Sequence, residues 1–187
     1  DKAAALISVS MSGVTVLNAS LLYPTRVARF IACDTNSSAP ESNRKAWGDR
    51  VAMAERDGAV SSQTNEPIIG ESLSEATVRR WFAPVSYETQ PEVPAKVKEV
   101  VNNNSLDGFR KSVAALCAYD IRERMASAQV PGLFVAGAQD GVLPKTMQTM
   151  AADLKGGAEL KIIEKAGHLP MVEQPAKFAE VVSDFLG

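Results

Sequence analysis

The chain has 187 residues, of which 45% are hydrophobic and 22% are charged, with a formal net charge of −2. These values are ordinary for a globular protein and do not favour nucleic acid or an anionic membrane as a partner. No apolar run reaches the ~18 residues that a membrane-spanning helix needs. One histidine and two distant cysteines match no zinc-binding spacing, so no metal is expected.

The first part of the chain predicts two strands and a helix. Residues 3–9 are small and β-branched, which is typical of a buried parallel strand. Residues 8–13 are mostly small, and residues 14–22 then predict a helix that ends before Pro24. A second strand is predicted over residues 27–33, with a polar loop from Asp34 to Ser38 after it. The two cysteines, in apolar settings and without a signal peptide before them, indicate reduced thiols and a cytoplasmic protein.

The pattern changes from residue 39 to residue 129, where strand-like runs disappear. Four charged, amphipathic segments predict helices over residues 43–56, 72–82, 94–102 and 106–118. We expect this region to be a helical insertion, or lid, within a single larger domain.

Strands and helices alternate again from residue 130 to the end. We predict strands over residues 132–136 and 159–163, a helix over 144–154, and a last helix from Pro175 with one apolar stripe. Strands that alternate with helices favour a parallel sheet, and therefore the α/β class. The expected division is a core of residues 1–38 and 130–187 and a helical lid of residues 39–129.

Three loops that each follow a predicted strand carry Ser10, Asp140 and His168. A serine hydroxyl needs a base to remove its proton and a carboxylate to orient that base. A sharp strand-to-helix turn at Ser10 would expose Oγ and direct the Met11 N–H toward a developing oxyanion. The chain order Ser, Asp, His is that of the α/β-hydrolase triad.

Each of these residues also has a plainer interpretation. Ser10 is equally explained as a turn serine or helix cap, His168 as a structural loop histidine, and Asp140 as a turn aspartate before glycine. Their combination favours the triad. The elbow pattern G-x-S-x-G has Ser8 and Ser12 at its glycine positions, and a Cβ at residue 12 can strain the turn.

Two tryptophans of the insertion, Trp47 and Trp81, have two interpretations. They are either helical core or the lining of an apolar substrate pocket. Arg50, one turn after Trp47, could pair with an anionic substrate, although a solvated helix face explains it more simply.

With these residues in place, the chain resembles the α/β-hydrolase superfamily, and within it the 3-oxoadipate enol-lactonase group. The stretch Ser-Val-Ser-Met-Ser-Gly at residues 8–13 is similar to that group's G-x-S-M-G-G. Residues 23–35 are similar to its H-P-x-R-V-x-x-L-x-L-x-x-T segment. The acid and base loops, typical of the whole superfamily, are residues 136–140 and 166–170, and the lid-like segments are residues 47–50, 80–84 and 112–122.

The resemblance implies a cofactor-independent hydrolase that opens a small ester or enol-lactone during the breakdown of aromatic acids. Ser10 would attack the carbonyl, His168 would act as base and then acid, and Asp140 would orient His168. Trp47 and Trp81 would bind substrate.

The chain departs from the family pattern before its first strand. A full member has about four further strands there, and one of their loops carries a His-Gly oxyanion segment. We therefore expect a fragment whose first strand presents an unpaired edge that favours self-association. The alternatives are a general carboxylesterase, a C–C-bond hydrolase, or a non-catalytic protein that binds a small molecule or a partner, whereas Ser10 argues against a dehalogenase, which would carry aspartate as nucleophile.

Overall fold

The computed structural model describes residues 5–187, which form two units. The sheet unit contains residues 5–38 and 120–187, and the helical unit contains residues 39–119. The helical unit is thus inserted into the sheet unit, as predicted.

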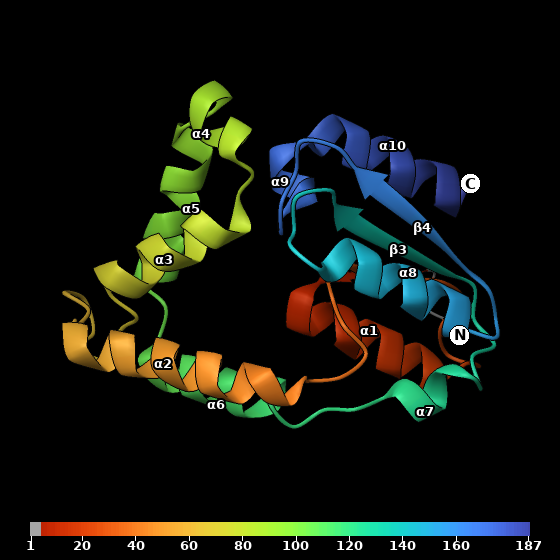
Figure 1. Cartoon of the computed structure of the whole chain (residues 1–187), viewed down its shortest axis with the longest axis horizontal. Helices are drawn as coiled ribbons and strands as arrows, with labels where there is room; N and C mark the ends of the chain where they lie inside the picture. Colours follow the sequence, from red (N-terminus) through yellow and green to blue (C-terminus); the bar gives the residue numbers. More distant parts are fainter. Residues whose placement is uncertain (1–4) are drawn as a thin grey trace. The chain divides into compact units, whose positions relative to one another are not determined.

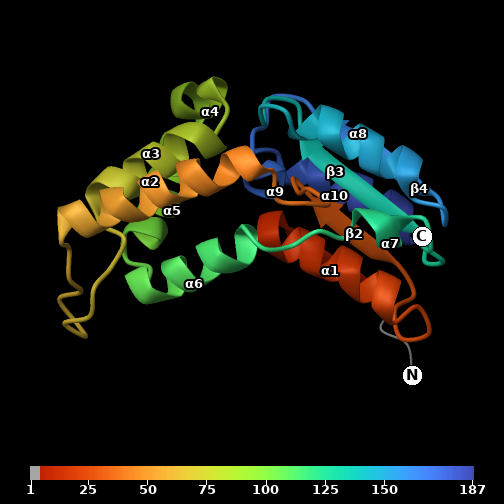
Figure 2. The same ribbon diagram turned by 60° about the horizontal axis from the view of Figure 1, so that its bottom comes forward.

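Four parallel strands form the sheet in the order β1-β2-β3-β4, and β2, β3 and β4 can be followed in Figure 2. The strands are β1 (Leu6–Val9), β2 (Phe30–Cys33), β3 (Gly132–Gly137) and β4 (Ala158–Ile163). The helices of this unit are α1 (Ser10–Leu22), α7 (Arg122–Met125), α8 (Leu143–Asp153), α9 (Pro170–Glu173) and α10 (Pro175–Leu186). The predicted parallel α/β sheet is confirmed.

The two central strands, β2 and β3, are buried along their whole length. On one face Ile31, Leu133 and Val135 pack in one cluster with Val181 of α10. Because side chains alternate along a strand, Phe30 and Phe134 lie on the opposite face. Their rings meet edge to face, with centroids 5.7 Å apart. Helices α1 and α8 cover this second face, while α10 lies behind the first (Figures 1 and 2).

Strand β1 lies at an edge of the sheet. The prediction placed a buried strand over residues 3–9, but in the described chain β1 pairs only with β2 and Ile7 is 46% exposed. Burial fails because no strand between residues 5 and 187 covers the far side of β1. Residues 3 and 4 lie outside the described residues. The expected unpaired edge is therefore observed, and self-association through it stays a prediction.

The helical unit consists of α2 (Glu41–Asp57), α3 (Glu71–Trp81), α4 (Pro84–Thr89), α5 (Glu92–Asn102) and α6 (Leu106–Leu116). Its core joins Ala54, Ile69, Leu73, Val101 and Leu106. The four predicted helices are all present. Helix α4 was not predicted, because it has only six residues and begins at a proline in its first turn.

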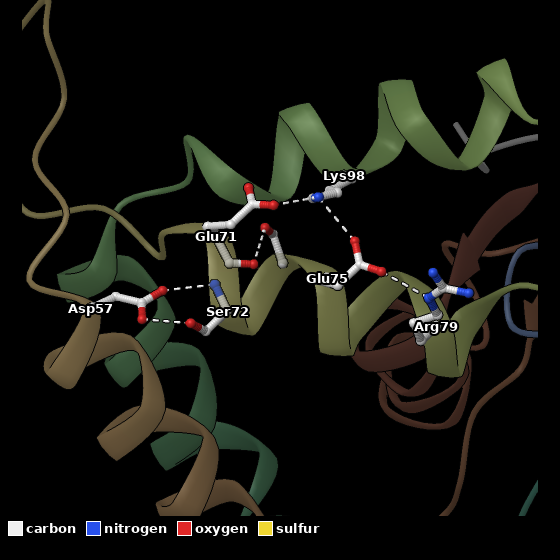
Figure 3. Close-up of polar contacts among 7 residues, drawn as sticks. Asp57, Glu71, Ser72, Glu75, Arg79 and Lys98 are labelled. Atoms are coloured by element: carbon white, nitrogen blue, oxygen red, sulfur yellow. Dashed lines mark hydrogen bonds and ion pairs between the residues drawn. The ribbon is translucent and has the colours of Figure 1, made fainter.

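Polar contacts tie three helices of this unit together (Figure 3). The Asp57 carboxylate accepts the backbone N–H of Ser72 at 2.7 Å, so the end of α2 caps the start of α3. Lys98 of α5 reaches Glu75 of α3 at 2.9 Å. Hydrogen bonds from Ser72 lower the pKa of Asp57, which marks its carboxylate as the capping species.

The predicted second boundary of the insertion, after residue 129, is wrong. The helical unit ends at residue 119, because a β-bridge pairs Ser38 with Asp120 and returns the chain to the sheet unit. The following helix α7 belongs there too: Met125 is 1% exposed, and Arg124 donates to Asn18 of α1 at 3.1 Å.

Neither cysteine forms a disulfide. Cys33 is buried and Cys117 is partly exposed, so only the first matches the expected buried thiol. No helix between residues 5 and 187 is both long and apolar enough to cross a membrane.

The packing of Phe30 on Gly132 yields a stability prediction. A Cβ at Gly132 would lie 2.1 Å from the tip of the Phe30 ring, which is fully buried and cannot move aside cheaply. We expect Gly132→Ala to destabilise the protein by about 1–3 kcal/mol, measured by urea unfolding. Gly48→Ala is the control, because the helical Gly48 has open space around its Cβ position and should gain up to ~1 kcal/mol. Equal stability of the two variants would contradict this account of the sheet.

Candidate active site

Ser10 lies at the junction where β1 ends and α1 begins. Its φ is +57°, a left-handed conformation that residues other than glycine rarely adopt. The helix starts at Ser10 and not at Val14 as predicted, so the turn is sharper than expected. Ser12 has no such backbone conformation, and the strain that we expected there is carried by Ser10 itself.

Close packing holds Ser10 beside the loop that follows β2. A Cβ at Gly13 would lie 3.0 Å from Thr35 Cβ and 3.1 Å from the Cys33 carbonyl oxygen. Glycine therefore lets α1 approach β2 closely. The Thr35 hydroxyl donates to the Ser10 carbonyl oxygen at 2.7 Å and links the two loops directly.

Met11 occupies the second position of α1. Backbone N–H groups in the first turn of a helix have no carbonyl four residues earlier in that helix to bind. The positive end of the helix dipole adds to the attraction of an anion at this point. This geometry suits the role of oxyanion donor, which stays a prediction for Met11.

Asp140 and His168 are in direct contact. The Asp140 Oδ2 lies 2.6 Å from His168 Nδ1, and the two side chains are only 13% and 11% exposed. The turn that carries Asp140 is closed by a hydrogen bond from its N–H to the Gly137 carbonyl at 3.1 Å. Gly141 completes the turn with a φ of +54°. The structure thus joins two of the three predicted catalytic side chains.

His168 lies on the loop after β4, and this loop contacts the loop at the end of β3. Its Ala166 carbonyl accepts the Gln139 N–H at 2.9 Å. The contact is so close that a Cβ at Gly137 would lie 1.9 Å from the Gly167 carbonyl oxygen. The carboxylate of Glu173, a residue that is 2% exposed, accepts the N–H of Gly167 in the same loop at 2.6 Å.

Sequence reasoning missed the part played by Asp34, which it assigned to a polar loop. Asp34 is 1% exposed and directly follows β2, the position that Ser10 holds after β1. One oxygen each from Asp34 and Asp140 and one ring nitrogen of His168 lie within 4.8 Å of one another. Burial, followed by the charge of Asp140, raises the pKa of Asp34 to about 9. The sequence signal that could have identified Asp34 is an acidic residue at the first position after a predicted strand.

Strained backbone gathers at this edge of the sheet. Four residues other than glycine between residues 5 and 187 have a positive φ, and Ser10, Asp34 and Lys165 of these follow β1, β2 and β4. Such conformations cost of order 1–3 kcal/mol each and persist where the surrounding structure enforces them, often at functional sites.

The two tryptophans of the helical unit occupy different environments. Trp47 has the Arg50 guanidinium over its ring at 4.3 Å and the Arg80 guanidinium at 5.7 Å. Burial lowers the pKa of Arg50, so this arginine is more than a solvated residue on a helix face. Trp81 packs against the core of the unit, in line with the plainer interpretation. A substrate-binding role stays a prediction for both tryptophans.

Both the sequence and the fold of this chain are similar to those of known proteins. The chain is 26% identical over 174 residues to 3-oxoadipate enol-lactonase 2 of Acinetobacter baylyi, a match that covers 93% of this chain and 60% of that protein. The crystal structure of the enol-lactonase from Burkholderia xenovorans LB400 superposes with a TM-score of 0.83 and 24% identity, over 96% of this chain and 64% of that one. The structure of a thermophilic esterase from Thermogutta terrifontis superposes with a TM-score of 0.81 and 22% identity, over 97% of this chain and 64% of that one.

These matches confirm the resemblance to the enol-lactonase group and the α/β-hydrolase fold. The chain spans about three fifths of the length of the curated relatives that it matches. The family model described as the alpha/beta hydrolase family matches residues 1–181. With the parallel sheet and the comparisons in agreement, the chain belongs to the alpha/beta hydrolase family.

Proposed function

We propose that this chain carries the catalytic residues of a serine hydrolase that acts on a small carboxylic ester or enol-lactone. The observation that supports it most is the 2.6 Å contact between Asp140 and His168. This pair lies at the same sheet edge as Ser10, whose left-handed backbone opens α1. A carboxylate that binds Nδ1 fixes the imidazole tautomer in which Nε2 can accept a proton.

The reaction follows from these roles. His168 removes the proton from Ser10 as Oγ bonds to the carbonyl carbon, and the Met11 N–H donates to the oxygen that gains the charge. The C–O bond of the ester then breaks, and His168 returns the proton to the leaving oxygen. Water repeats the sequence to release the acid and restore Ser10. In a lactone the leaving oxygen stays attached to the acyl group.

The substrate class is supported by the relatives. Proteins named 3-oxoadipate enol-lactonase match nearly the whole chain, and an esterase shares the fold. We therefore place a 3-oxoadipate enol-lactone, from aromatic-compound breakdown, first among the substrates and an open carboxylic ester second. Trp47 and Trp81 would contact this substrate, and the proposed chemistry needs no cofactor.

A second candidate is a hydrolase-fold protein that binds a small molecule without turnover. One observation favours it: Ser8 and Ser12 replace the glycines of the elbow pattern.

Labelling with a fluorophosphonate probe tests Ser10 as the nucleophile. We expect one label at Ser10, located by peptide mass spectrometry, because only an activated serine attacks the phosphorus atom. His168→Ala should slow labelling on the order of 10²–10⁴-fold by removing the base. Ser12→Ala is the matched control and should label like the unaltered chain. An unlabelled but fully folded protein would favour the second candidate.

Replacement of Asp140 tests the orienting carboxylate. Asp140→Asn keeps the size of the side chain but lets it donate to Nδ1, which selects the wrong imidazole tautomer. We expect ester hydrolysis or labelling to fall by roughly 10⁴-fold, the loss seen when the triad aspartate of a serine protease becomes an amide. The exposed Asp153 supplies the control Asp153→Asn. An unchanged rate in Asp140→Asn would remove Asp140 from the mechanism.

A further inference from the structure

The mechanism above gives no role to Asp34, a buried carboxyl group at the site. Asp34 is the first residue after β2, the strand that separates β1 from β3 in the sheet. Its side chain is therefore between the loops that carry Ser10 and Asp140. It is 1% exposed and has a φ of +43°, so the fold maintains a strained residue to keep this group inside.

The two oxygens of Asp34 differ in their partners. Oδ1 accepts the backbone N–H of Gly137 at 3.0 Å. Oδ2 is buried and has no hydrogen-bond donor facing it. The polar group that it meets is the Asp140 carboxylate, which is itself an acceptor. Two ionised carboxylates have no proton to share, and an unsatisfied buried oxygen is costly.

The groups around Asp34 make this environment negative. Asp140 contributes the largest charge effect on Asp34, and Glu173 of α9 adds to it, while the Gly137 N–H acts in the opposite direction. The neighbouring Cys33 thiol has its pKa raised by burial and stays protonated. Helix α1 contains no charged residue, and a ring nitrogen of His168 lies within 4.8 Å of one oxygen each of Asp34 and Asp140.

We propose that Asp34 is a positioning residue that carries a proton and donates its O–H to the Asp140 carboxylate, forming a chain from Asp34 through Asp140 to His168. The proton belongs to Asp34 because this residue is 1% exposed, whereas the Asp140 side chain is 13% exposed and already bound to the imidazole. The pKa of about 9 for Asp34 agrees with this assignment.

The chain of hydrogen bonds has two effects. It satisfies Oδ2 of Asp34, and it holds the Asp140 carboxylate against rotation away from His168. It also leaves one negative charge beside the imidazole where two ionised aspartates would leave two. The inference rests on the proposed function for the role of His168, but the chain of hydrogen bonds can be measured without turnover.

The single histidine of the protein makes the measurement direct. We would label the full chain with ¹⁵N-histidine and follow the His168 ring signals and the Nδ1 proton from neutral pH to above pH 9, with a chelator present. Ionisation of Asp34 adds a charge near the ring, so we expect a step in the His168 shifts with a midpoint near the Asp34 pKa of about 9. Asp34→Asn should abolish this step and keep the Nδ1 proton signal, because an amide donates to Asp140 and accepts from Gly137.

Two further variants complete this experiment. Asp34→Gly suits the left-handed backbone but removes the donor, and we expect its Nδ1 proton to exchange with water faster than in Asp34→Asn. Asp153→Asn, at an exposed site of the same unit, should keep the step of the unaltered chain. A step that survives in Asp34→Asn, or no step in the unaltered folded chain, overturns the proposal. Failure of Ser10 labelling would instead contradict only the proposed function.

The same proton predicts how stability depends on pH. The pKa of Asp34 rises from 3.8 to about 9 on folding, so between these values the folded state holds a proton that the unfolded state has lost. The contribution of this proton to the free energy of unfolding is complete below pH 3.8 and declines as pH rises toward 9. We expect Asp34→Asn, whose amide keeps both hydrogen bonds, to raise Tm at pH 8–9 relative to the unaltered chain, with a gain that shrinks toward pH 4. A gain in the Tm of Asp34→Asn that did not depend on pH would show that Asp34 is ionised in the folded protein.

Discussion

Everything at the candidate site depends on one constraint, the burial of two adjacent parallel strands on both faces. Strands β2 and β3 leave no side exposed, so the chain must return through covering helices after each strand. All four strands then point the same way, and all four following loops open at one edge. This brings Ser10, Asp140 and His168 to a common edge although their loops lie far apart in sequence.

That convergence has an energetic cost, which the rest of the unit offsets. Ser10 and Asp34 adopt left-handed backbones, and the carboxyl groups of Asp34 and Asp140 gather beside one imidazole, with the charge of Glu173 acting on Asp34 as well. Close contact at Gly137 leaves the loops no room to relax. The buried core offsets this cost, and the loops of the candidate site are held in place by the fold itself.

Local pattern predicted most of this arrangement. The apolar runs at β2 and β3, the alternating polar and apolar residues of β4 and the amphipathic helices are local patterns, so the existence of these elements and the parallel sheet followed from the sequence. The edge position of β1 could be anticipated only by comparison with a longer family pattern. The helix α4, the true end of the insertion and the burial of Asp34 could not be predicted, because they depend on contacts between distant segments. A bridge between Ser38 and Asp120 produces no repeating pattern of apolar residues by which it could be predicted.

That bridge has an evolutionary consequence. Backbone hydrogen bonds from Ala39 to Tyr119 and from Ile121 to Ser37 join the two ends of the insertion immediately beside it. The two ends of the insertion therefore lie side by side, at a separation that a short turn between β2 and β3 could also span. Any segment whose ends meet at that spacing can replace residues 39–119 without changing the register of the sheet. Sequence changes within residues 39–119 can therefore accumulate while the four strands keep their pairing.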